Sequence, residues 1–179
     1  MKQQVEHGKK LFNYKPKRGI QYLIKIGHIK EETSKEVAKF LLFTEGLDRT
    51  QIGDYMGTIS NPFCKSVLYD YVDLQRFENM EIYDALRQFL LGFRLPGEGN
   101  IIDVIMEKFA ERYYNDNKKA EVCIFRNADA VYIFAYHMIM LATDLHNPAI
   151  KRKITKPEWI KNNTGLNDGL YFRSKHKIG

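Results

Sequence analysis

The chain has 179 residues, 44% hydrophobic and 28% charged, so it can bury a core of its own and is not a disordered polymer. Its longest apolar stretch without a formal charge, 130–143, is shorter than the roughly 20 residues that span a bilayer, and the first residues contain no apolar signal region. The net charge is +6, and we expect a cytoplasmic protein without a membrane-spanning helix.

The positive charge is concentrated at the two ends. Residues 1–30 hold eight Lys or Arg against Glu6, and 149–179 hold eight against two acids, so the middle of the chain is net negative. Because a nucleic-acid groove spreads its charge along the core elements, we expect no nucleic-acid partner. An anionic membrane surface and plain solubility both remain open. Cys64 and Cys123 lack metal-ligand spacing, which predicts reduced thiols and no metal site.

From Lys35 onward, apolar residues recur at helical spacing and never alternate for long with the period of two that a strand requires. Turn signals such as Asn61-Pro62, Pro96-Gly97 and Asn147-Pro148 separate the helical runs. The sequence therefore predicts an all-α protein with a right-handed stack of helical hairpins in its first part. The expected runs are 35–43, 52–56, 62–73, 80–93, 98–114 and 127–145.

The turn at 93–99 presents a carboxylate. Glu98 follows the rigid Pro96-Gly97 turn and precedes Gly99, so no bulky neighbour shields it, and we expect an exposed tip. The alternative is an ordinary helix start, where an acidic residue complements the helix dipole.

The segment 130–145 is apolar on all sides, which is typical of a central helix. One face is predicted as core and carries Val131, Ala135, Met138, Ala142 and Leu145. A second face has polar-tipped side chains and runs towards Asn147; it carries Tyr132, Tyr136, Ile139, Met140 and Thr143. Because a tyrosine suits a surface with one dry and one wet end, this face favours a groove wall, with plain core as the alternative.

Four stretches occur together: EGLD at 45–48, IGDY at 52–55, FRLPGE at 93–98 and MLATDLHNP at 140–148. In combination they resemble the Sec7 domain, the catalytic module of guanine-nucleotide exchange factors for Arf small GTPases, from about Phe12 to Asp168. The resemblance implies a two-lobed helical domain, with an N-terminal lobe of about 12–115 and a C-terminal lobe of about 116–179. Residues 1–11 would then be a basic extension or a tag remnant.

The resemblance also implies the site. The domain's groove binds the switch regions of GDP-bound Arf, and Glu98 matches the glutamate that is inserted towards the phosphate and magnesium of the nucleotide. The partner-binding positions are Asp129, Tyr132, Tyr136, Ile139, Met140, Asp144 and Asn147, together with Thr143 of the same face. No cofactor of the chain's own is implied, since magnesium and GDP are held by the partner. The implied setting is vesicle trafficking on Golgi or endosomal membranes.

Two positions and the C-terminal end depart from the family pattern. Ala142 stands where Asn is usual, His137 stands where small residues are common at a position that matters for brefeldin, and the chain after 169 is shortened. Two other functions are considered: a helical scaffold that binds a partner without exchanging its nucleotide, and a hydrolase using Asp144 and His146 with Glu98. Since Asp144 and His146 are two apart on a helix, they point to different sides, which argues against the hydrolase.

Overall fold

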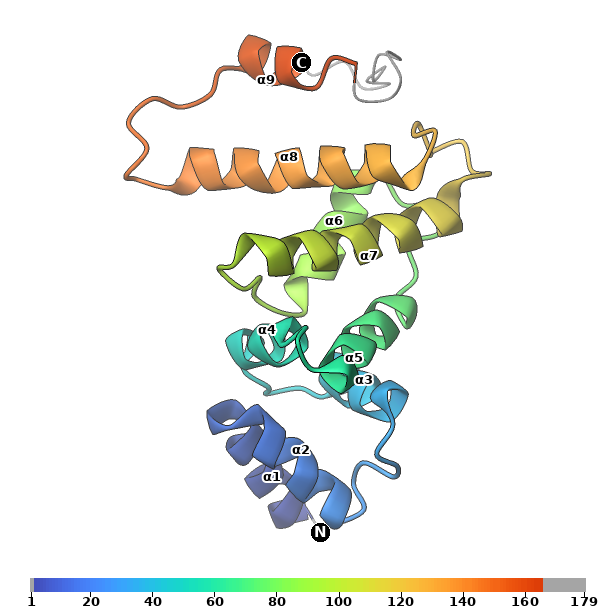
Figure 1. The fold of residues 1–179 in the computed structure, drawn as a ribbon, viewed down its shortest axis with the longest axis vertical. Coiled ribbons are helices and arrows are strands. Elements are labelled where there is room, and N and C mark those ends of the chain that lie inside the picture. Colours follow the sequence, from blue (N-terminus) through green and yellow to red (C-terminus); the bar gives the residue numbers. More distant parts are fainter. Residues whose placement is uncertain (1, 166–179) are drawn as a thin grey trace. The chain divides into compact units, whose positions relative to one another are not determined.

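The computed structural model describes residues 2–165, and this part of the chain forms nine α-helices and no strand (Figure 1). The predicted all-α class is confirmed. The helices are α1 (Lys2–Tyr14), α2 (Pro16–Lys25), α3 (Ser34–Phe43), α4 (Arg49–Gly57), α5 (Pro62–Asp73), α6 (Ile82–Leu91), α7 (Gly99–Asn117), α8 (Ala128–His146) and α9 (Lys156–Asn162).

The helices belong to two compact units. Among the described residues, one unit comprises 2–76 and 86–108 and the other comprises 77–85 and 109–165, so α6 and α7 each contribute residues to both. The sequence placed the lobe boundary near 115, whereas this division passes through α7 between 108 and 109. Because this boundary lies inside a continuous helix, no turn or linker in the sequence marks it.

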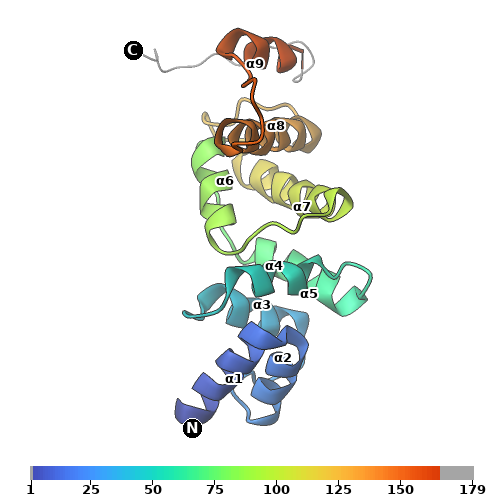
Figure 2. The same ribbon diagram turned by 90° about the vertical axis from the view of Figure 1, so that its left-hand side faces the viewer.

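The helices α1 and α2 form a hairpin in which they lie side by side (Figures 1 and 2). A Cβ atom at Gly8 would overlap the Leu23 side chain, and one at Gly19 would overlap the backbone of Phe12, so the two glycines allow the close approach. The structure differs here from the sequence prediction, which set residues 1–11 outside the domain. Residues 2–11 lie in α1, packed on α2 in the first unit.

Side-chain caps fix where several helices begin. Asp48 accepts hydrogen bonds from the backbone N–H groups of Thr50 and Gln51 at the start of α4. Asn61 caps α5 and Asn127 caps α8 in the same way. The predicted signals at 61–62 and 147–148 are confirmed, since α5 begins at Pro62 and α8 ends at His146.

The second unit is built around a chain of aromatic rings that runs from α7 to α9. Successive ring centroids lie 5.2 to 6.3 Å apart through Phe77, Phe109, Tyr113, Phe125, Phe134 and Trp159. A buried amide fastens the segment before α6 to the end of α7. Asn117 donates to the carbonyl of Phe77 at 2.8 Å and accepts from the amide of Asn79, also at 2.8 Å. Because both of its polar groups are satisfied, this amide holds residues 77–79 against the end of α7.

No helix among residues 2–165 is long and apolar enough to cross a membrane. The expected shortened terminus and the basic residues at 173–177 lie outside the described residues.

Candidate functional site

Glu98 lies at the end of a loop, residues 92–98, that leads from α6 into α7; we call it the Glu98 loop. Its carbonyl oxygen accepts hydrogen bonds from the amides of Ile101 and Ile102, both at 3.1 Å, so Glu98 sits directly before the first turn of α7. The side chain is exposed, as expected from the Pro-Gly turn. Within residues 2–165 its carboxylate forms no hydrogen bond or ion pair, so it is available to an external group.

Buried aromatic residues hold the base of the Glu98 loop. Phe93 is buried and contacts the rings of Phe89 and Tyr71, with centroids 5.1 and 5.9 Å away. Gly92 leaves room for the Tyr71 hydroxyl, which an added Cβ atom would overlap. Burial raises the pKa of Tyr71 to about 12, so this phenol stays neutral under the loop.

A surface pocket of about 470 Å³ adjoins Glu98 in the same unit. Its polar lining comes from the end of α4 and the start of α7, with Asp54, Thr58, Ser60 and Asn100 beside Glu98. No sequence pattern predicts this pocket, although Asp54 belongs to the IGDY stretch that carries the family resemblance. The carboxylates and hydroxyls make the surroundings of Glu98 polar and net negative.

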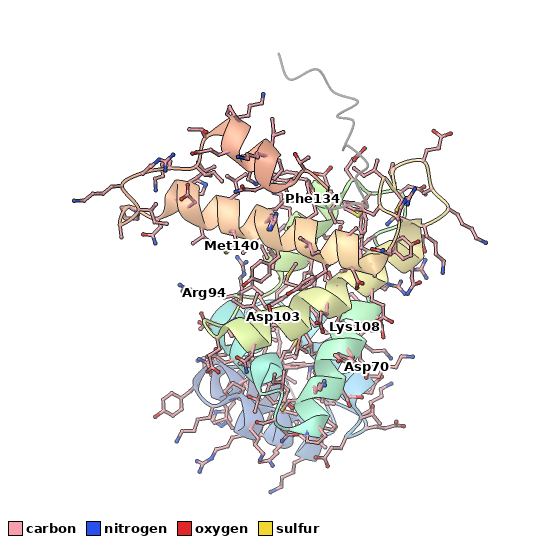
Figure 3. All side chains as sticks on the ribbon, turned by 45° about the horizontal axis from the view of Figure 1, so that its top comes forward. Asp70, Arg94, Asp103, Lys108, Phe134 and Met140 are labelled. Atoms are coloured by element: carbon pink, nitrogen blue, oxygen red, sulfur yellow. The ribbon has the colours of Figure 1, made fainter. Side chains whose placement is uncertain are left out.

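The predicted partner-binding residues lie on α8 and at its C-cap, Asn147, in the other unit, and Figure 3 labels one of them, Met140. We call Tyr132, Tyr136, Ile139, Met140 and Thr143 the tyrosine stripe. Met140 is 58% exposed and Thr143 is exposed, whereas Tyr132, Tyr136 and Ile139 are half-buried. The rings of Tyr132 and Tyr136 contact each other with centroids 6.0 Å apart. Asp129, in the first turn of α8, is exposed. The stripe is therefore an accessible apolar surface with polar tips.

The opposite face of α8 is core only over its first half. Val131 and Ala135 are fully buried, but Met138 is half-buried and Ala142 and Leu145 are exposed, so the prediction of a core face over the whole helix is wrong. The aromatic core reaches α8 only at Phe134. Among the described residues, the second half of α8 contacts the segment after α8 and the short helix α9, through Asp144 with Ile154 and His137 with Asn163.

Asp144 and Asn147 hold the chain as it turns back from α8. Asp144 accepts a hydrogen bond from the Ile154 amide at 2.9 Å, and Asn147 accepts one from the Ala149 amide at 3.0 Å. Lys153 donates to the carbonyl oxygens of both residues, at 2.5 and 2.7 Å. The two predicted partner-binding side chains thus have structural roles in this turn, a task that the sequence analysis did not assign to them.

His137 is a packed residue rather than part of the stripe. Its Nδ1 lies 3.0 Å from Oδ1 of Asn163, whose Nδ2 donates to the Trp159 carbonyl at 2.7 Å. Because that second bond fixes the orientation of the amide, Oδ1 is the acceptor and His137 Nδ1 is the donor. The pair closes one side of a cavity of about 240 Å³ that also borders Met140 and Asp144. Nothing in the sequence pairs His137 with Asn163 in advance.

The hydrolase alternative gains no support from α8. The carboxylate of Asp144 is half-buried and engaged with the Ile154 amide, whereas His146 is exposed in the last turn. A general base needs a basic group within hydrogen-bond reach of the proton that it removes. No contact between these two side chains provides such a pair.

The family model described as "Sec7 domain" matches residues 1–176. Among curated relatives, the human "Brefeldin A-inhibited guanine nucleotide-exchange protein 1" is 48% identical over 167 residues, which cover 93% of this chain and 9% of that protein. The chain therefore spans about a tenth of the length of the curated relatives that it matches.

Solved structures give the same match. The crystal structure of the Sec7p catalytic domain has a TM-score of 0.85 and 42% identity, covering 92% of this chain and 87% of that one. A structure of ARF1-GDP bound to a Sec7 domain complexed with brefeldin A also has a TM-score of 0.85, with 34% identity, 96% coverage of this chain and 84% of that one.

Proposed function

The chain belongs to the Sec7 domain family, and on this premise we propose that it is a guanine-nucleotide exchange factor that binds an Arf-family GTPase in its GDP form and releases the GDP. Two descriptions support this partner. The human relative is named a guanine nucleotide-exchange protein, and one similar structure contains ARF1-GDP on a Sec7 domain. The proposal concerns the activity of the domain alone, since the named relatives are about ten times longer.

Glu98 carries the proposal, because its carboxylate is exposed at the end of the Glu98 loop without a partner in the described part of the chain. A negative charge placed about 4 Å from a phosphate costs about 4 kcal/mol at an effective dielectric constant of about 20. Each 1.4 kcal/mol changes an affinity about tenfold. Glu98 would also compete for the magnesium ion, which prefers oxygen ligands and otherwise holds the phosphates.

The tyrosine stripe supplies the binding energy that offsets this repulsion. Burial of its apolar surface against the GTPase would contribute about 25 cal/mol per Å². The exchange factor stabilises the nucleotide-free GTPase, so GDP and the factor oppose each other in binding, and abundant GTP then releases the factor. No cofactor of the chain's own takes part, because magnesium and GDP come with the GTPase.

The test is release of a fluorescent GDP from soluble ARF1, with and without this chain, after addition of excess GTP. The proposal predicts that release accelerates in proportion to the concentration of the chain. A scaffold would form a complex with ARF1 and leave the release rate unchanged, which would contradict the proposal.

We also propose that the chain works in vesicle trafficking, in peripheral contact with Golgi or endosomal membranes. The support for the membrane contact is the net charge of residues 1–30, which hold eight basic side chains against one acid. Most of these basic side chains are exposed: Lys2, Lys10, Lys15, Lys17, Arg18, Lys25 and Lys30. Exposed basic groups are attracted to anionic lipid.

A further inference from the structure

From its first residue to its last, α4 has one face against the Glu98 loop and the residues that flank this loop. Arg49, Gly53 and Gly57 follow one another at intervals of four, so they share one side of this helix. Each of them meets a different part of the loop or its flanks, and all of these residues belong to the first unit. We call these three residues the Arg49 face.

Arg49 holds the start of the Glu98 loop. Its Nη2 donates to the carbonyl of Leu90 at 2.7 Å and to that of Phe93 at 3.3 Å, at the end of α6. Its own carbonyl accepts from the Arg94 amide at 2.9 Å. A guanidinium at a helix C-terminus satisfies carbonyls that have no partner within the helix and complements the helix dipole. One residue thus fixes 90, 93 and 94 through three hydrogen bonds.

The two glycines hold the middle and the end of the loop at close range. A Cβ atom at Gly53 would overlap the carbonyl oxygen of Arg94, the residue labelled in Figure 3. At Gly57 a Cβ atom would lie 2.9 Å from Pro96 Cγ and 3.2 Å from Ile101 Cγ2. Neither glycine has a positive φ, so the backbone conformation of α4 does not require glycine here. Glycine is required because the loop approaches α4 closely at these two positions.

The start of α4 is itself anchored to the hairpin at the N-terminus. Asn13 of α1 accepts from the Asp48 amide at 2.7 Å and donates to the Gly46 carbonyl at 2.9 Å. Asp48 in turn caps α4 with bonds of 2.8 and 3.0 Å. The EGLD and IGDY stretches, whose chemical task is not evident from their residue types, therefore form one continuous support for the loop.

We propose that the Arg49 face positions Glu98: it sets the distance to which the carboxylate can be inserted, and it acts on GDP release without contributing to the binding of the GTPase. This inference rests on the proposed exchange function. Arg49, Gly53 and Gly57 are positioning residues, since they touch the loop and not the nucleotide. A misplacement of a reacting group by about 1 Å can cost about 100-fold in rate.

The experiment compares Gly53→Ala and Arg49→Ala with the unaltered chain in fluorescent-GDP release from soluble ARF1, and resolves kcat from KM. Gly53→Ala pushes the loop away, whereas Arg49→Ala removes the two side-chain hydrogen bonds to Leu90 and Phe93 without adding bulk and keeps the backbone carbonyl that accepts from Arg94. We expect kcat to fall at least about tenfold in both while KM changes less than twofold, with partial rescue of kcat by Arg49→Lys. Hydrogen exchange of the Arg94 amide provides a readout without ARF1, and it should accelerate in both variants.

The control is Gly19→Ala, whose added Cβ overlaps the backbone of Phe12 inside the α1–α2 hairpin of the same unit. It should lower the melting temperature but keep kcat and the exchange rate of the Arg94 amide. Wild-type kcat in Gly53→Ala and Arg49→Ala would overturn the inference, and so would an equal loss of kcat in Gly19→Ala. If the unaltered chain does not accelerate GDP release from ARF1, the proposed function is wrong instead. The hydrogen-exchange rate of the Arg94 amide in the variants then still tests whether α4 holds the loop.

Discussion

Met140 illustrates at the scale of one residue how exposure separates partner binding from stability. It lies on the tyrosine stripe and is 58% exposed, so more than half of it is open to a partner. Leu145 is on the same helix, 50% exposed and away from the stripe, which makes it a matched apolar control.

We predict that Met140→Ala slows nucleotide release through a higher KM, while the melting temperature stays within about 2 °C of the unaltered chain. The reason is that truncation of an exposed side chain removes surface for the partner without leaving a cavity in the core. Leu145→Ala should change neither quantity. Equal losses of activity in both variants would mean that the stripe is not the binding surface.

At the scale of elements, α9 is a seven-residue helix whose start depends on a capping box. Thr155 accepts from the Glu158 amide at 3.4 Å. The Glu158 carboxylate accepts from the backbone N–H and the hydroxyl of Thr155, both at 2.9 Å. The hydrogen bonds from Thr155, with a contribution from Arg152, lower the pKa of Glu158 below its ordinary value of 4.5. The ionised form is therefore bound more tightly in the folded protein.

A depressed pKa gives a defined pH dependence. The stabilisation by Glu158 is fully present above pH 4.5, the ordinary value, and is lost as the pH falls below it through the folded pKa. We predict that α9 loosens in this acidic window. The fluorescence of Trp159, the single tryptophan of the chain, should report it. Glu158→Gln keeps an acceptor at this position but cannot ionise, so its Trp159 signal should lose this transition; an unchanged transition would exclude the capping box as its cause.

How far each element could be predicted depended on what its buried face is made of. The runs at 62–73 and 127–145 bury apolar side chains and carry Asn caps, and both were predicted within a residue or so. The α1–α2 hairpin was missed because α1 buries only Gly8 and Phe12 and so shows little apolar period, although α2 buries Ile20 and Leu23 on one face. Helix α9 was missed although Thr155 and Glu158 have the spacing of a capping box.

The candidate site divides in the same way. The exposure of Glu98 follows from a local turn and could be predicted from the neighbouring Pro and Gly. The bonds from Arg49 to the carbonyls of Leu90 and Phe93 could not, since they join residues more than 40 positions apart through backbone atoms that no sequence pattern marks.

At the scale of the whole molecule, charge distribution is the property that bears on location. Residues 1–30 carry eight basic side chains against one acid, and each could contribute about 1 kcal/mol near an anionic surface. This attraction falls off within about 8 Å at physiological salt.

We predict that the chain binds vesicles containing acidic lipid at low ionic strength and is released near physiological salt, whereas release of GDP from soluble ARF1 changes far less. Vesicle flotation across a salt series measures this, with neutral-lipid vesicles as the control. Failure to bind acidic vesicles even at low salt would leave solubility as the role of these charges.

The central claim is that one carboxylate ejects GDP, and the rate of fluorescent-GDP release with Glu98→Lys tests it most directly. Glu98 is exposed and forms no hydrogen bond or ion pair within residues 2–165, so the variant should keep the melting temperature of the unaltered chain. Reversal of the charge attracts the phosphate instead of repelling it, and we predict that release falls to the rate of ARF1 alone. Release at the unaltered rate by folded Glu98→Lys would contradict the account.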